Sequence, residues 1–151
     1  MPPRIFLDTS AIFSALWSAT GGGRELLKLS EANAIRATVS SHVLAETDSV
    51  VRRKAGGRVG ELVMLLDDTR LEIVPAAEQA REEQSLALLS YTNDAKVIAA
   101  AWQAEVDYFV TLDRQHFLDN EPLKAAVPFP IGTPGDCLAW LSVQLSTPES
   151  E

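Results

Sequence analysis

The pattern of apolar and polar positions along the chain predicts strands and helices in alternation. Short apolar runs typical of buried strands cover residues 4–7, 35–39, 71–74 and 108–112. Each run leads into a segment whose apolar residues recur with the spacing of a helix that has one buried face. Residues 128–131 predict an edge strand at most, because proline cannot donate a hydrogen bond to a neighbouring strand. This alternation is typical of an α/β fold with a parallel or mixed sheet covered on both faces.

Helical periodicity and local end signals place the helices between these strands. Ser40 or Ser41 caps the third helix, which ends at Gly56-Gly57, and Asn93 caps the sixth. The predicted helices cover residues 10–17, 24–32, 41–55, 58–68, 78–89, 94–105, 113–118 and the segment that Thr133 opens.

Two sequence features are interpreted as structural. Gly21-Gly22-Gly23 lacks the Lys-Ser/Thr pair that follows a phosphate-binding P-loop, so we expect a flexible turn that breaks the chain. Trp17, Trp102 and Trp140 fall on apolar helical faces. We therefore expect these tryptophans to be packing residues and not platforms for stacked bases.

Length and composition predict one folded domain. The chain has 151 residues, of which 46% are hydrophobic and 23% charged, which is ordinary for a globular protein. We set the domain at residues 1–145 and expect a flexible tail at 146–151. No signal peptide is expected, and no apolar run approaches the ~20 residues that cross a bilayer. With a single cysteine, Cys137, the chain is expected to be cytoplasmic and free of membrane contact.

Net charge argues against long-range attraction of nucleic acid. The formal charge is −8 at pH 7, which repels polyanions. Part of this charge would belong to a metal site, where bound divalent ions invert the local field. A short basic stretch, Arg52, Arg53, Lys54 and Arg58, still allows a local binding groove.

Four acidic residues lie where an α/β fold would bring them together. Asp8 and Asp113 directly follow apolar strand runs, and the strand-to-helix edge of a parallel sheet is where ligands bind. Asp94 lies in the first turn of a helix, and Glu46 adjoins the apolar stripe of another. Each acid alone could be a helix-entry or surface residue, so only the set is persuasive.

Converging carboxylates predict a hard divalent ion, because crowded negative charges repel unless a cation lies between them. Oxygen ligands favour Mg²⁺ or Mn²⁺. Zinc is disfavoured, since Cys137 and the histidines His42 and His116 form no zinc motif. His42 and Glu46 are one helical turn apart, but a solvated role is favoured over a shared metal.

The chain resembles the PIN-domain family of metal-dependent ribonucleases, and more narrowly its VapC-like branch of toxins from toxin–antitoxin pairs. Residues 6–10 (FLDTS) look like the family's first strand and first aspartate, and residues 40–46 (SSHVLAE) look like the helix that supplies its glutamate. Residues 93–95 (NDA) begin a similar alanine-rich helix, and 109–113 (FVTLD) resemble the closing strand and last acid. Residues 133–136 (TPGD) resemble the branch's final helix entry.

One position departs from the pattern. Leu112 precedes Asp113, where the branch often has a small or polar residue. The resemblance implies a three-layer α/β/α sandwich with a mainly parallel central sheet, one or two Mg²⁺ or Mn²⁺ ions and hydrolysis of RNA. It also implies an antitoxin partner and homodimer formation.

These expectations assign roles to individual residues. Asp8, Glu46 and Asp94 hold an ion that polarises the phosphate, and Asp113 completes the site directly or through water. Three polar residues support them: Ser10 and Thr111 orient carboxylates, and Asn93 contacts water or phosphate. The expected contacts to the RNA backbone are Arg52, Arg53, Lys96 and Arg114.

Two other functions remain open at this point. A receiver or phosphatase-type phosphotransfer domain also places an Asp after a parallel strand, although Asp8-Thr9-Ser10 lacks the second Asp of a phosphatase. Alternatively, the chain is a PIN-like scaffold that binds a partner protein without catalysis.

Overall fold

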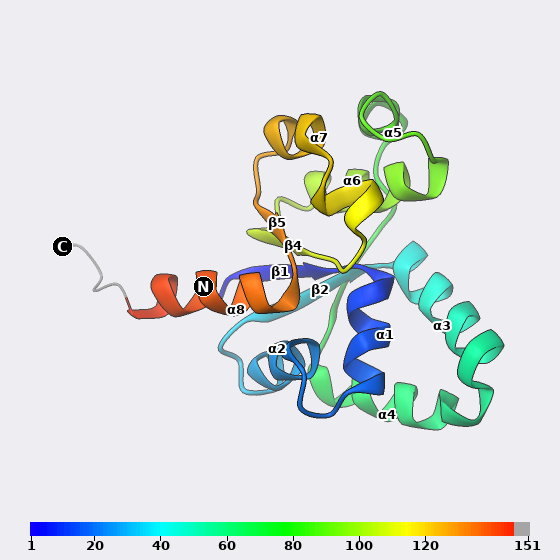
Figure 1. Ribbon diagram of the computed structural model, residues 1–151, viewed down its shortest axis with the longest axis vertical. Coiled ribbons are helices and arrows are strands. Elements are labelled where there is room, and N and C mark those ends of the chain that lie inside the picture. Colours follow the sequence, from blue (N-terminus) through cyan, green and yellow to red (C-terminus); the bar gives the residue numbers. More distant parts are fainter. Residues whose placement is uncertain (147–151) are drawn as a thin grey trace.

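A computed structural model describes residues 1–146 and contains a central sheet of parallel strands (Figure 1). Its strands are β1 (Arg4–Leu7), β2 (Arg36–Ser40), β3 (Glu72–Val74), β4 (Tyr108–Val110) and β5 (Ile131–Gly132). Every neighbouring pair is parallel, and the order across the sheet is β3-β2-β1-β4-β5. The chain therefore moves outward from β1 and returns beside it as β4, which makes the junction of β1 and β4 the topological switch point where such sheets bind ligands.

Helices cover both faces of this sheet, with α1 to α4 and α8 on one side and α5 to α7 on the other (Figure 1). Their bounds are α1 (Thr9–Trp17), α2 (Gly22–Glu31), α3 (Ser41–Ala55), α4 (Val59–Thr69), α5 (Gln79–Leu86), α6 (Thr92–Gln103), α7 (Glu121–Ala126) and α8 (Pro134–Ser146). Short turn helices η1 (Gly56–Arg58) and η2 (Arg114–Leu118) lie between them. The predicted three-layer α/β/α sandwich is confirmed.

Two buried aromatic residues pack against each other on the neighbouring strands β1 and β4. Phe6 on β1 and Phe109 on β4 are fully buried, and their rings stack with centroids 5.3 Å apart. Burying each such ring contributes roughly 1.5–3 kcal/mol. This packing fixes the two strand ends from which Asp8 and Asp113 emerge.

Polar residues at the strand ends begin the helices that follow. Asp8 caps α1, Ser40 caps α3 and Asp113 caps η2, each accepting a backbone N–H in the first turn. The predicted cap at Asn93 is wrong: α6 begins at Thr92, two residues before the predicted start, and its cap position is Tyr91. Asp94 still lies in the first turn of α6, where the helix dipole favours a carboxylate.

The glycine segment also differs from its prediction. The break between α1 and α2 covers residues 18–21 and includes Gly21, whereas Gly22 and Gly23 are already part of α2. A Cβ on Gly23 would lie 3.1 Å from the carbonyl oxygen of Ala11 and 3.2 Å from the Cβ of Ala15. Glycine is therefore used here because α2 packs closely against α1.

Helix α7 has no counterpart in the sequence prediction. Asn120 caps it through a bond from the N–H of Leu123, and a proline lies in its first turn. Asn-Glu-Pro at residues 120–122 was the helix-start signal that could have revealed it. The predicted tail at 146–151 lies outside the described residues except for Ser146, which ends α8. None of the helices in the described part of the chain has the length and apolar character needed to cross a bilayer.

Candidate active site

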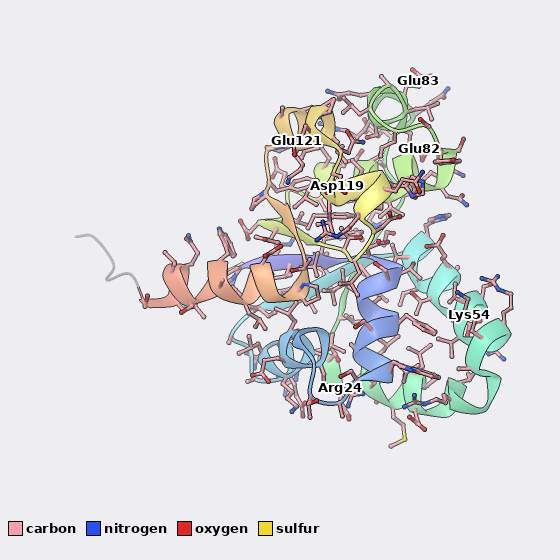
Figure 2. The ribbon with its side chains drawn as sticks, in the orientation of Figure 1. Arg24, Lys54, Glu82, Glu83, Asp119 and Glu121 are labelled. Atoms are coloured by element: carbon pink, nitrogen blue, oxygen red, sulfur yellow. The ribbon has the colours of Figure 1, made fainter. Side chains whose placement is uncertain are left out.

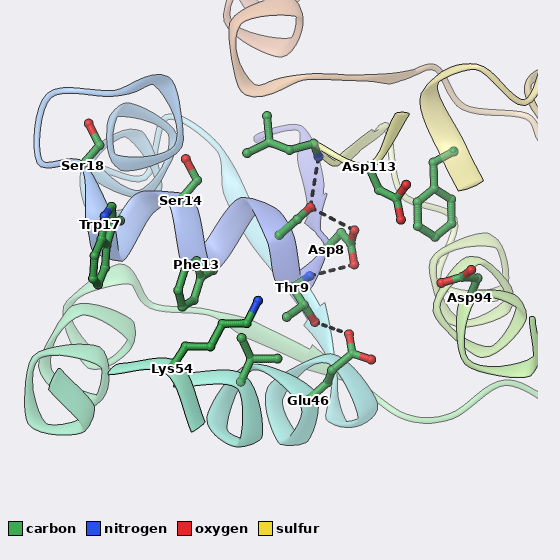
Figure 3. A pocket seen from close by; sticks show the side chains of 14 residues that line it. Asp8, Thr9, Phe13, Ser14, Trp17, Ser18, Glu46, Lys54, Asp94 and Asp113 are labelled. Atoms are coloured by element: carbon green, nitrogen blue, oxygen red, sulfur yellow. Dashed lines mark hydrogen bonds between the residues drawn. The ribbon is translucent and has the colours of Figure 1, made fainter. Parts of the chain in front are cut away.

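A pocket of about 480 Å³ contains all four predicted carboxylates in its lining (Figure 3). Asp8 reaches it from the end of β1 and Asp113 from the segment after β4. Glu46 comes from α3 and Asp94 from the first turn of α6. Four segments that are distant in sequence thus place their acids around one cavity at the switch point of the sheet.

Asp8 is the most tightly held of the four. One carboxylate oxygen accepts the N–H of Thr9 at 2.7 Å, and the other accepts the hydroxyls of Thr111 at 2.8 Å and Ser10 at 3.1 Å. Burial raises the pKa of Asp8 to about 6, these hydrogen bonds oppose the rise, and the charge of Glu46 adds to it. Asp8 is only 6% exposed, so its charge is costly without a nearby cation.

Thr111 and Ser10 connect the ends of β1 and β4. The N–H of Asp113 donates to Thr111 Oγ1 at 3.0 Å, and the N–H of Leu112 donates to Ser10 Oγ at 3.0 Å. Because the same hydroxyls donate to Asp8, they fix this carboxylate relative to the backbone of Asp113. These hydrogen bonds support the orienting roles assigned to Ser10 and Thr111, which stay predictions.

Glu46 and Asp94 face the pocket from opposite helices. Glu46 Oε1 accepts the hydroxyl of Thr9 at 2.6 Å, which draws it towards Asp8. Burial raises the pKa of Asp94; the charge of His116 opposes this rise, and those of Asp113 and Glu46 add to it. The pKa shifts of Asp8 and Asp94 therefore share one cause, loss of solvent in an acidic pocket.

His116 is a site residue that the sequence analysis missed. Its Nδ1 lies 2.8 Å from Asp113 Oδ2 and 3.6 Å from Asp94 Oδ2, and its ring meets Tyr91 edge to face. The hydrogen bond with Asp113 raises the pKa of His116. Its position three residues after Asp113, on the same helical face, was the available signal.

The other end of the pocket is aromatic and basic. Phe13 and Trp17 on α1 and Lys54 on α3 line it. The prediction that Trp17 packs in the core is wrong, because its side chain is 59% exposed beside the open pocket. Trp102 and Trp140 do pack against the core as predicted.

The predicted supporting and RNA-contacting residues are mostly peripheral. Asn93 is exposed, and Arg52 and Arg114 pair with Asp48 and Asp119 on the surface. The pocket lining contains Lys54 and none of Arg52, Arg53, Lys96 and Arg114. The RNA contacts assigned to these four residues stay predictions, and Lys54 is the one lysine or arginine in the lining of this pocket.

The donor set fits a hard divalent ion chemically. Among the ion pairs of residues 1–146, none joins a lysine or arginine to any of the four carboxylates. Within the same residues, no three His, Cys, Asp or Glu side chains lie close enough to coordinate one ion as they stand. The four acids share one pocket, and their oxygen atoms are ligands that Mg²⁺ or Mn²⁺ prefers.

Zinc chemistry has no support in this arrangement. Burial raises the pKa of the Cys137 thiol to about 12, so this thiol is neutral. His42 Nε2 is buried without a hydrogen-bond partner among the described residues, and His42 is not part of the pocket lining. The His42–Glu46 pair is thus split, with only Glu46 facing the pocket.

Comparisons with known proteins agree with this geometry. The family model of the PIN domain matches residues 4–115, which include all four carboxylates. A search of the curated proteins finds no match.

Solved structures with a similar fold include three VapC or VapBC proteins. DNA-bound VapBC of Salmonella typhimurium has a TM-score of 0.63 and 19% identity, covering 87% of this chain and 98% of that chain. VapBC2 of Rickettsia felis, bound to a DNA fragment from its promoter, has a TM-score of 0.59 and 20% identity. The match covers 85% of this chain and 96% of that chain. VapC20 of Mycobacterium tuberculosis, a toxin that cleaves the sarcin–ricin loop, has a TM-score of 0.52 and 22% identity. The match covers 74% of this chain and 91% of that chain. At these identities the likeness shows a shared fold.

Proposed function

The chain belongs to the PIN domain family, and from this premise we propose that it is a ribonuclease that hydrolyses RNA phosphodiester bonds with Mg²⁺ or Mn²⁺. The observation that carries the proposal is the pocket itself, in which four carboxylates from β1, α3, α6 and the end of β4 face one another. Hydrolysis of a phosphodiester is favoured when the negative charge on the phosphate is stabilised, and divalent ions held by these carboxylates would supply that stabilisation.

In this proposal Asp8, Glu46 and Asp94 hold one or two ions, and Asp113 completes the site directly or through water. When bound, the ion would neutralise the carboxylates, polarise the scissile phosphate and lower the pKa of the attacking water. The chain's own contribution is orientation. The Thr111 hydroxyl donates to Asp8 Oδ2 at 2.8 Å and accepts the backbone N–H of Asp113 at 3.0 Å.

His116 positions the other half of the site. Its contact with Asp113 at 2.8 Å, and its approach to Asp94 at 3.6 Å, keep these two acids on one side of the pocket. A side chain that hydrogen-bonds to a ligating carboxylate limits the rotation of that carboxylate and keeps its oxygen atoms directed at the ion site.

We further propose that the protein is the toxin of a toxin–antitoxin pair. The similar folds of VapBC proteins from Salmonella typhimurium and Rickettsia felis, and of the VapC20 toxin, support this assignment. It predicts a small antitoxin protein that binds this chain and suppresses cleavage. Homodimer formation and a cytoplasmic location stay predictions from the sequence.

Phosphotransfer through Asp8 is the less favoured activity. Both oxygens of this side chain already accept hydrogen bonds, and the residue is 6% exposed. A carboxylate held in this way is poorly placed to attack a phosphoryl donor. Incubation with acetyl phosphate should therefore leave the intact mass of the protein unchanged.

Cleavage of a fluorescently labelled single-stranded RNA tests the proposed function. The protein should cut the RNA with Mg²⁺ or Mn²⁺, lose this activity in EDTA, and recover it when the ion is restored. A preparation that leaves several RNA sequences intact, in either ion, would contradict the proposal and favour the scaffold role.

A further inference from the structure

The aromatic end of the pocket, defined as Phe13, Trp17 and Lys54, continues the acidic end along helix α1 (Figure 3). Phe13 and Trp17 are four residues apart, and their rings lie nearly parallel, with centroids 5.8 Å apart and planes at 11°. At a rise of about 1.5 Å per residue, they lie about 6 and 12 Å beyond Thr9 along the α1 axis. The two ends therefore form one continuous surface.

Trp17 is exposed but held in place. Its side chain is 59% exposed, although burial of a tryptophan usually stabilises the folded chain. The guanidinium of Arg58 lies over the Trp17 ring, 4.9 Å from the ring centroid. The same guanidinium donates hydrogen bonds to the carbonyl of Leu16 and to the carboxylate of Glu61. An exposed ring fixed on one edge of a pocket is already arranged for a flat ligand, which lowers the entropic cost of binding.

Lys54 supplies an uncompensated positive charge beside these rings. Within residues 1–146 it takes part in no ion pair, whereas Arg52 and Arg58 pair with Asp48 and Glu61. Figure 2 shows Lys54 and Arg24 in the half of the molecule that contains α1 to α4, and the labelled acids of α5 and α7 in the other half. A polyanion is thus less strongly repelled along α1 than across α5 to α7.

We infer that the aromatic end binds a nucleotide flanking the scissile phosphate of single-stranded RNA, with its base stacked on Trp17 and Phe13 and its phosphate on Lys54. This rests on the proposed function and names a subsite for it. Aromatic faces stack any base, and a lysine contacts backbone phosphate, so the subsite selects single strands without a strict sequence. Bases inside a duplex are already stacked and cannot enter it.

Binding of a short labelled single-stranded RNA, measured by fluorescence anisotropy without metal, tests the subsite. All variants carry Asp8→Asn, so the probe is not consumed. Trp17→Ala and Lys54→Ala should each weaken binding about tenfold, the range expected for one lost stack or phosphate contact. Trp17→Phe should retain part of the affinity because a ring remains.

Two matched variants control for general effects. Trp102 also lies under an arginine, with Arg81 4.7 Å from its ring, but away from the pocket lining, so Trp102→Phe should bind RNA normally. Lys28→Ala removes an exposed lysine of α2 and should also have no effect. Unchanged affinity in Trp17→Ala and Lys54→Ala would overturn the subsite and leave this surface to a protein partner.

The outcome separates this inference from the proposed function. If the wild-type protein cleaves RNA and Trp17→Ala cleaves it with the same KM, the subsite is wrong and the nuclease stands. If the wild-type protein fails to cleave in Mg²⁺ and Mn²⁺, the nuclease is wrong, whatever the binding data show. The stabilisation that divalent ions give should be equal in wild-type and Trp17→Ala proteins, since Trp17 contacts none of the acids.

Discussion

The acidic and aromatic ends of the pocket are built in different ways. At the acidic end, Asp8 is buried and bonded through both oxygens, and Thr111 ties it to the next strand. At the aromatic end, Trp17 is exposed and held by the stacked ring of Phe13 and by Arg58, and Lys54 takes part in no ion pair within residues 1–146. We expect the first end to control ion binding and chemistry, and the second to control substrate affinity. Substitutions can therefore separate the two ends.

Asp8→Asn should have the largest effect. It removes one negative charge of the ion site with almost no change in volume, so cleavage should fall by at least about a hundredfold. RNA binding without metal should be unchanged or tighter, because a repulsive charge is lost. The measurement pairs initial cleavage rates with anisotropy.

Asp107→Asn is the matched control for this substitution. Asp107 precedes β4 at the opposite end of the sheet and accepts the N–H of Arg4 at 2.7 Å. This variant should cleave RNA like the wild-type protein. Cleavage by Asp8→Asn at the control's rate would remove Asp8 from the site.

The pH dependence of stability should give the next largest effect. The pKa of Asp8 is near 3.8 when unfolded and about 6 when folded, so between these values the folded state binds more protons. The free energy of unfolding then falls as pH rises, by on the order of 3 kcal/mol by pH 7.5 in EDTA. Asp8→Asn lacks this loss, so urea denaturation should find it more stable than the wild-type protein at pH 7.5 and similar at pH 4.

Divalent ions should offset the same loss. Mg²⁺ or Mn²⁺ should raise the melting temperature of the wild-type protein more at pH 7.5 than at pH 5, because ligands must be deprotonated to bind. The melting temperature of Asp8→Asn should rise only slightly with either ion, at both pH 7.5 and pH 5. An equal shift in the two proteins would place the ion elsewhere.

The two ends also differ in how far the sequence predicts them. Asp8 and Asp113 could be assigned because strand ends are local features and the order of a parallel sheet brings them together. Trp17 was misassigned because periodicity gives the face of a helix but not whether a neighbouring helix covers it. The approach of Lys54 likewise depends on how α3 packs against α1, which has no signal in the spacing of residues.

Thr111→Val tests the support of the acidic end. It removes the donor to Asp8 and leaves the N–H of Asp113 without its acceptor, while keeping the shape of the side chain. Ion affinity, measured by isothermal titration, should fall about tenfold or more. Thr38→Val is the control, since Thr38 is equally buried but lies on β2 away from the pocket lining. Equal ion affinity in the two variants would mean that Thr111 serves only the fold.

The salt dependence of RNA binding gives the smallest effect and separates the two parts of the aromatic end. Neutralising one phosphate of a single strand contributes about 0.7 to the slope of log affinity against log salt. Lys54→Ala should lower the magnitude of this slope by about 0.7, whereas Trp17→Ala should weaken binding at every salt concentration without changing the slope. Stacking releases no counterions. A variant whose plot of log affinity against log salt is parallel to that of the wild-type protein has therefore lost a ring contact, and a variant with a shallower plot has lost a contact of the ammonium group with phosphate. If both variants keep the wild-type slope, Lys54 contacts no phosphate, and the affinity of this end depends on the rings alone.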